Sequence, residues 1–77
     1  MRELVSTLVR GLVREPDQVR VYEEDADGRL VFELLVAEGD RGRVIGREGR
    51  TVNALRTVLA AVARERGGGS CELEIID

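Results

Sequence analysis

A Gly-x-x-Gly turn near the middle of the chain is the feature that most restricts how this sequence can fold. Gly46 and Gly49 flank Arg47 and Glu48, and the pattern after the turn is that of a helix. Two glycines at this spacing let the backbone bend sharply, and they remove side chains that would keep another molecule at a distance. The turn would direct unpaired N–H groups and the positive end of a helix dipole to one spot, which predicts a phosphate-binding site.

The positive charge of the sequence is concentrated around this turn. The whole chain has a net charge of −3, and all 12 of its basic residues are arginine. Residues 39–66 nevertheless contain seven arginines and three acids, a net charge of +4, whereas residues 1–38 contain five arginines and nine acids. A local basic block can attract an anionic polymer whatever the charge of the whole chain. The alternative is a charged face that contacts only solvent.

Length and composition predict one small domain over residues 1–77. A domain of this size buries only about 60% of the surface of its unfolded chain, so it needs a tight core. Cys71 is the only cysteine and there is no histidine, so we expect no disulfide, no metal site and no cofactor. The single cysteine, the absence of an apolar leader and the lack of any apolar run near the roughly 18 residues of a membrane span predict a cytoplasmic protein without membrane insertion.

The spacing of apolar residues predicts a helix, two strands, two helices and a final strand. In chain order these elements cover residues 2–14, 19–24, 29–37, 41–45, 51–66 and 71–76. Pro16 ends the first helix because the residue before a proline avoids helical geometry, and Asp40 is expected to cap the short helix. The middle strands form an antiparallel hairpin, and the long helical connection to the last strand allows parallel pairing. The order αββααβ predicts a two-layer α+β domain with a three-stranded mixed sheet packed against helices.

A resemblance to a known family rests on residues 42–50, which read GRVIGREGR. This segment resembles the signature of K-homology (KH) domains, in which a Gly-x-x-Gly loop clamps four backbone nucleotides. The order of elements is similar to the type II, prokaryotic form of the fold. Similarity runs from residues 3–5 to residues 74–77, so the whole chain resembles the small single-KH bacterial RNA-binding proteins of the KhpA type.

The resemblance implies a cytoplasmic RNA-binding protein or RNA chaperone that binds single-stranded RNA. It also implies protein partners, either as a homodimer or as a heterodimer with a larger KH-domain protein of the KhpB type. Members of the family are linked in some bacteria to cell elongation and envelope regulation, and the same process is expected for this chain on the resemblance alone.

The candidate RNA-binding residues lie in the turn and on both sides of it. The amides of Gly46 and Gly49 would carry the contact with the sugar-phosphate backbone, more than the net charge of the side chains. Glu48 would oppose phosphate unless it pairs with Arg50 or points away. The complete set of candidates is Arg43, Ile45, Gly46, Arg47, Glu48, Gly49, Arg50, Asn53 and Arg56.

Residues beside the turn have open alternatives. Either Ile45 or Val44 would form part of an apolar groove floor, while the other packs in the core. Asn53 and Arg56 lie in the first turns of the next helix and could reach RNA, although a position on the solvent face is the alternative for Asn53.

Three other side chains carry expectations about packing. Phe32 is expected in the core, and Cys71 is expected to be a buried small apolar residue. For Tyr22 a core or sheet-packing position is favoured over a surface position near a partner. Because Tyr22 and Phe32 are the only aromatics, extensive stacking of bases on aromatic rings is not available.

An enzyme is disfavoured. The chain has no histidine and no lysine, and the turn lacks the Gly-Lys-Ser/Thr end of a phosphate-binding P-loop. The alternative to RNA binding is a dimerisation module that keeps the KH fold and binds RNA only weakly. An apolar patch around Ala60, Ala61 and Ala63 would support that alternative.

Overall fold

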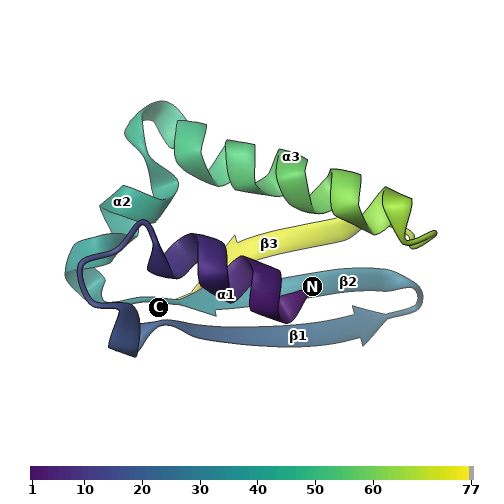
Figure 1. Ribbon diagram of the computed structural model, residues 1–77, viewed down its shortest axis with the longest axis horizontal. Helices are drawn as coiled ribbons and strands as arrows, with labels where there is room; N and C mark the ends of the chain where they lie inside the picture. The colour runs from purple at the N-terminus through teal and green to yellow at the C-terminus, as the bar shows by residue number, and fades with distance from the viewer. Residues whose placement is uncertain (77) are drawn as a thin grey trace.

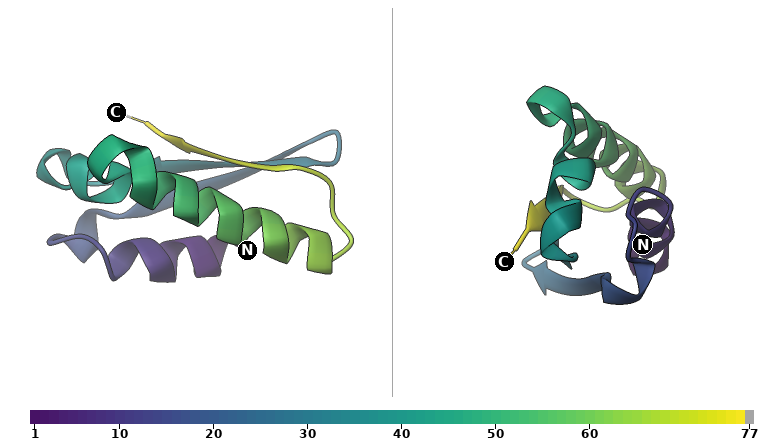
Figure 2. Two further views of the ribbon diagram at one scale, coloured as in Figure 1. Left: turned by 90° about the horizontal axis from the view of Figure 1, so that it is seen from above. Right: turned by 90° about the vertical axis from the view of Figure 1, so that its left-hand side faces the viewer.

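The expected order of helices and strands is present in residues 1–76, which the computed structural model describes (Figure 1). The elements are α1 (Arg2–Arg10), β1 (Arg20–Ala26), β2 (Arg29–Leu35), α2 (Arg41–Ile45), α3 (Arg50–Glu65) and β3 (Cys71–Ile75). The helices cover one face of the sheet and leave the other uncovered (Figures 1 and 2). The predicted two-layer α+β architecture is therefore confirmed. None of the helices in these residues is long and apolar enough to cross a membrane.

The sheet is mixed, as the lengths of the connections predict. Its strand order is β1-β2-β3, with β1 antiparallel and β3 parallel to β2. Asp27 and Gly28 both have positive φ, at 54° and 82°, so the hairpin closes in a two-residue turn of the kind that matches strand twist. β1 therefore continues to Ala26, two residues beyond its predicted end.

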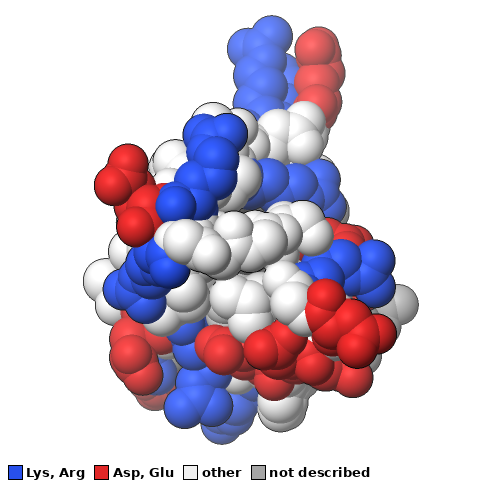
Figure 3. Space-filling view, turned by 90° about the vertical axis from the view of Figure 1, so that its right-hand side faces the viewer, with Lys and Arg blue, Asp and Glu red and all other residues white. Residues whose placement is uncertain are grey.

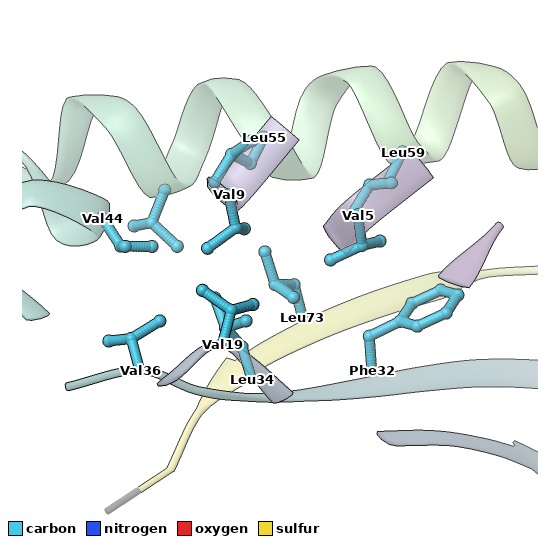
Figure 4. Close-up of a cluster of buried hydrophobic side chains, with 11 residues drawn as sticks. Val5, Val9, Val19, Phe32, Leu34, Val36, Val44, Leu55, Leu59 and Leu73 are labelled. Atoms are coloured by element: carbon cyan, nitrogen blue, oxygen red, sulfur yellow. The ribbon is translucent and has the colours of Figure 1, made fainter. Parts of the chain in front are cut away.

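The core lies between the sheet and the helices. Its side chains come mainly from the three helices α1, α2 and α3 and the two strands β2 and β3, and they point toward one another in Figure 4. The most buried of them include Val5, Val9, Phe32, Leu34, Val44, Leu59 and Leu73. Phe32 is in the core as predicted, and Cys71 is partly buried against it. Burial and the nearby Glu23 and Glu72 carboxylates raise the pKa of the Cys71 thiol, which keeps it protonated at neutral pH.

The predicted core or sheet-packing position of Tyr22 was wrong, because its side chain is half exposed. Side chains alternate between the two faces of a strand, and Val19 and Val21 are the residues of this segment that turn toward the helices. Tyr22 consequently lies on the uncovered face of the sheet, opposite Glu33 in the register.

α1 ends at Arg10, four residues before its predicted end, and Asp40 holds the segment that follows it in a non-helical path. The Asp40 side chain is only 2% exposed, and its two carboxylate oxygens accept the backbone N–H groups of Arg14 and Glu15, each at 3.0 Å. A continued helix would need these N–H groups for carbonyls one turn earlier. The predicted role of Asp40 was wrong as well, since its side chain makes no capping hydrogen bond to α2.

Candidate nucleic-acid interface

The Gly-x-x-Gly loop joins α2 to α3 through one turn of 3-10 helix, η3 (Arg47–Gly49). Gly46, Glu48 and Gly49 have φ values of 77°, 57° and 76°, and these three positive angles within four residues reverse the chain direction. The loop projects from one end of the molecule (Figure 1). It lies at the N-terminus of the 16-residue helix α3, where the positive end of the helix dipole attracts anions.

The free N–H groups of the loop are not those of the glycines. Gly46 donates to the carbonyl of Gly42 at 2.8 Å, and Gly49 donates to the carbonyl of Gly46 at 3.1 Å. Among the described residues, the amides of Arg47 and Glu48 donate to no backbone carbonyl. The expectation that glycine amides are the free donors is therefore wrong, and the two amides between the glycines take that role.

Gly46 is required by the protein itself. A Cβ atom at this position would overlap Thr51 Oγ1 and lie 2.8 Å from the backbone nitrogen of Thr51. At Gly49 the nearest atom to such a Cβ would be Asn53 Nδ2 at 3.6 Å, which is an ordinary contact. The loop thus folds tightly back on the first turn of α3 at Gly46, and Gly49 supplies only its positive φ.

The loop side chains leave one arginine unpaired. Glu48 turns toward Arg50, with 3.7 Å between its Oε2 and the arginine Nη2, and both side chains are about three-quarters exposed. Such an exposed pair contributes little stability, but it places the Glu48 carboxylate beside Arg50. Arg43 faces the buried Asp40 instead of the loop, with 3.8 Å between its Nε and the carboxylate. Arg47 makes no ion pair with the described residues.

Asn53 and Arg56 connect the loop to the edge of the sheet. The Asn53 side chain lies beside Gly49, and its Oδ1 accepts a hydrogen bond from Arg56 Nη1 at 3.1 Å. Arg56 Nε and Nη2 both donate to the carbonyl oxygen of Leu73 in β3, at 3.3 and 3.1 Å. The two predicted residues therefore form a continuous polar path along α3. The role of the Leu73 carbonyl was missed, because a backbone group leaves no signal in a sequence.

The structure separates the two apolar candidates that precede the loop. Val44 is fully buried in the core, and Ile45 is exposed on α2. Of the two alternatives, Val44 is therefore the one that packs in the core, and Ile45 is the apolar side chain available beside the loop.

A shallow apolar hollow lies on the other flank of α3, against α1. It has a volume of about 230 Å³ and is lined by Leu8, Leu12, Thr51, Ala54, Leu55 and Val58. Leu12 is 38% exposed and Val58 44% exposed. Of the three alanines at which an apolar patch would support dimerisation (Ala60, Ala61 and Ala63), Ala63 is buried in the core. Leu12 lies beyond the end of α1, although the predicted helix over residues 2–14 included it.

Negative charge is concentrated away from the loop. Alternation along the strands places Glu24, Glu33, Glu72 and Glu74 on the uncovered face of the sheet, where Arg29 forms an ion pair with Glu72 at 2.9 Å. Figure 3, which views the molecule from the end away from the loop, shows acidic side chains in its lower half with arginines between them. In residues 1–76 the acids and the thiol form no group that could hold a metal ion. The carboxylates on the uncovered face of the sheet would repel a polyanion from that face.

The order of elements and the Gly-x-x-Gly loop between α2 and α3 are those of a KH domain. The family model described as the KhpA/KhpB KH domain matches residues 2–75. The chain therefore belongs to the KhpA/KhpB family of KH-domain proteins.

Curated relatives are similar over most or all of their length. RNA-binding protein KhpA of Chlamydia trachomatis is 40% identical over 77 residues, which cover 100% of this chain and 97% of the relative. The protein of the same name from Listeria monocytogenes is 39% identical with 100% of both chains covered. The Thermotoga maritima protein is 44% identical over 62 residues, or 80% of this chain and 83% of the relative. These relatives are RNA-binding proteins, and the family is not one of enzymes.

Proposed function

We propose that this protein binds single-stranded RNA by holding its sugar-phosphate backbone at the loop formed by residues 46–49. The observation that carries the proposal is the pair of free amides at Arg47 and Glu48, held at the N-terminus of α3 beside an unpaired arginine. Phosphate oxygens accept hydrogen bonds from such amides, and the helix dipole favours their charge. The names of the relatives support RNA as the ligand.

The rest of the site gives the RNA a direction. From the loop, the polar path through Asn53 and Arg56 leads to the edge strand β3, and Ile45 supplies an apolar surface beside it. Arg50 adds charge at the start of α3, whereas Arg43 acts mainly by holding the buried Asp40. A short site of this kind should bind a few nucleotides weakly, with a strong dependence on salt.

Reversing the loop charge tests this proposal. The double variant Arg47→Asp, Glu48→Asp is expected to weaken RNA binding by about tenfold or more, because the carboxylates repel phosphate next to the free amides. Aspartate tolerates the positive φ of position 48, so the melting temperature should change little. Anisotropy of a fluorescein-labelled 12-nucleotide RNA measures the affinity. Arg2→Asp makes the same change in net charge at the N-terminus of α1, which lies away from the loop (Figure 1), and should bind like the parent. Unchanged affinity in the loop variant would exclude this site.

Pairing through the hollow between α1 and α3 is the second function that the structure favours. If two copies pair through this hollow, Leu12 and Val58 become buried. Exposed apolar surface of this kind is unfavourable in water for a small domain. Asn53 and Arg56 lie on the flank of α3 that faces β3, so RNA and a second copy would not compete for one surface. Val58→Glu is expected to give a monomer with unchanged RNA affinity in sedimentation and anisotropy measurements. A parent protein that sediments as a monomer at high concentration would refute the pairing.

The family resemblance carries the remaining proposals. The same hollow would receive a larger KH-domain protein of the KhpB type, and the protein would act as a cytoplasmic RNA chaperone in cell elongation and envelope regulation. Co-purification from cells, followed by sequencing of crosslinked RNA, tests these roles together.

A further inference from the structure

β3 offers a free edge of backbone groups beside the polar path. It is an edge strand of the sheet, because only β2 lies beside it. Beyond its two ends, the carbonyl of Ser70 and the N–H of Ile76 form hydrogen bonds with β2. Because backbone groups alternate in direction along a strand, Glu72 and Glu74 also face β2. Cys71, Leu73 and Ile75 therefore direct their N–H and C=O groups to the open edge. An edge of this kind can read a nucleobase through hydrogen bonds.

Arg56 changes what this edge presents. Its Nε and Nη2 donate to the Leu73 carbonyl at 3.3 and 3.1 Å, and a carbonyl oxygen has only two lone pairs to accept with. A third bond joins Nη1 to Asn53 Oδ1. A guanidinium has five N–H groups, so two remain for a ligand. The acceptor of the edge is thus replaced, at the same place, by a cation that only donates.

We propose that Arg56 determines the base preference of this protein, favouring guanine over adenine. The inference rests on the proposed path of RNA from the loop toward β3. Guanine presents two adjacent acceptors, O6 and N7, which match a guanidinium, whereas adenine replaces O6 with an amino donor that opposes it. If Leu73 were open, its carbonyl would instead accept from the adenine amino group. The two purines also differ at N1 and at the 2-amino group of guanine, so the test has to separate the contribution of O6 from that of the 2-amino group.

The side chain is held in place for this role. Two acceptors from different elements, α3 and β3, fix the guanidinium, so little entropy is lost when a base binds to it. Arg56 is exposed on α3 and lies beside β3. The course of α3 and β3 can be followed in Figure 2.

The test compares three eight-nucleotide RNAs, (GU)4, (AU)4 and (IU)4, in which I is inosine, at RNA concentrations low enough that the self-complementary (AU)4 stays single-stranded. The parent protein should bind (GU)4 about fivefold or more tightly than (AU)4. Inosine keeps O6 and lacks the 2-amino group, so (IU)4 should bind like (GU)4. Arg56→Met opens the Leu73 carbonyl, and the ratio should fall to one or reverse. Arg64→Met removes the same charge from the same helix and should keep the parental ratio.

The outcomes separate this inference from the proposed function. If Arg56 only holds α3 to β3, Arg56→Met will weaken all three RNAs equally, and the inference fails while the RNA site stands. Equal binding of the three RNAs by the parent also overturns the inference alone. Binding of none of them by the parent overturns the proposed function and the inference with it.

Discussion

Replacing Gly46 with alanine is expected to destabilise the fold by about 3 kcal/mol and to abolish RNA binding. Its φ of 77° and ψ of 167° lie in a region that essentially only glycine occupies. A Cβ atom would also lie 2.8 Å from the backbone nitrogen of Thr51, and a backbone atom cannot rotate away as a side chain can. The loop would have to open, which separates the free amides from the N-terminus of α3. Urea denaturation followed by circular dichroism measures the loss.

Two other glycines serve as controls for this change. Gly49→Ala meets no close atom and places alanine at a φ of 76°, so it should cost about 1 kcal/mol. Gly42→Ala lies inside α2 with nothing within 4 Å and should be neutral or slightly stabilising. Equal losses for Gly46→Ala and Gly49→Ala would show that the contact with Thr51 has no energetic importance.

Asp40→Ala should destabilise the protein by a similar amount, about 3 kcal/mol, because it leaves the N–H groups of Arg14 and Glu15 without their charged acceptor. Asp40→Asn keeps one acceptor oxygen and should lose about half as much. Glu38→Ala removes an exposed acid two residues away and should change the free energy of unfolding by less than about 0.5 kcal/mol. A comparable effect of Asp40→Ala and Glu38→Ala in urea denaturation would contradict this role of the carboxylate.

The apolar pattern was sufficient to predict the sheet and the order of the elements. Alternation identified both strands of the hairpin, and the stripe of α3 identified the helix that faces the core. The end of α1 could not be predicted in the same way. The chain after it is held at Arg14 by a carboxylate 26 residues further along the sequence, and helical periodicity contains no information about such a contact.

For the candidate site, the sequence predicted which segment of the chain forms it better than it predicted which backbone groups are free to bind a ligand. The motif located the loop, and the positions of Asn53 and Arg56 on α3 were close enough to it to be included. Which amides are free depends on hydrogen bonds inside η3, and the partner of Arg56 is a backbone carbonyl 17 residues away. These are consequences of tertiary packing, so no residue type signals them.

The uncovered face of the sheet, with its four glutamates, has a consequence for RNA molecules longer than one site. Each bound domain would turn this face outward, away from the strand that it holds. The surface of such a coated strand would then be negative in its protein part as well as in its phosphates. Neighbouring coated strands would repel one another, and a single domain would not bridge two of them. Only a pairing of domains would let this protein bring separate RNA strands together.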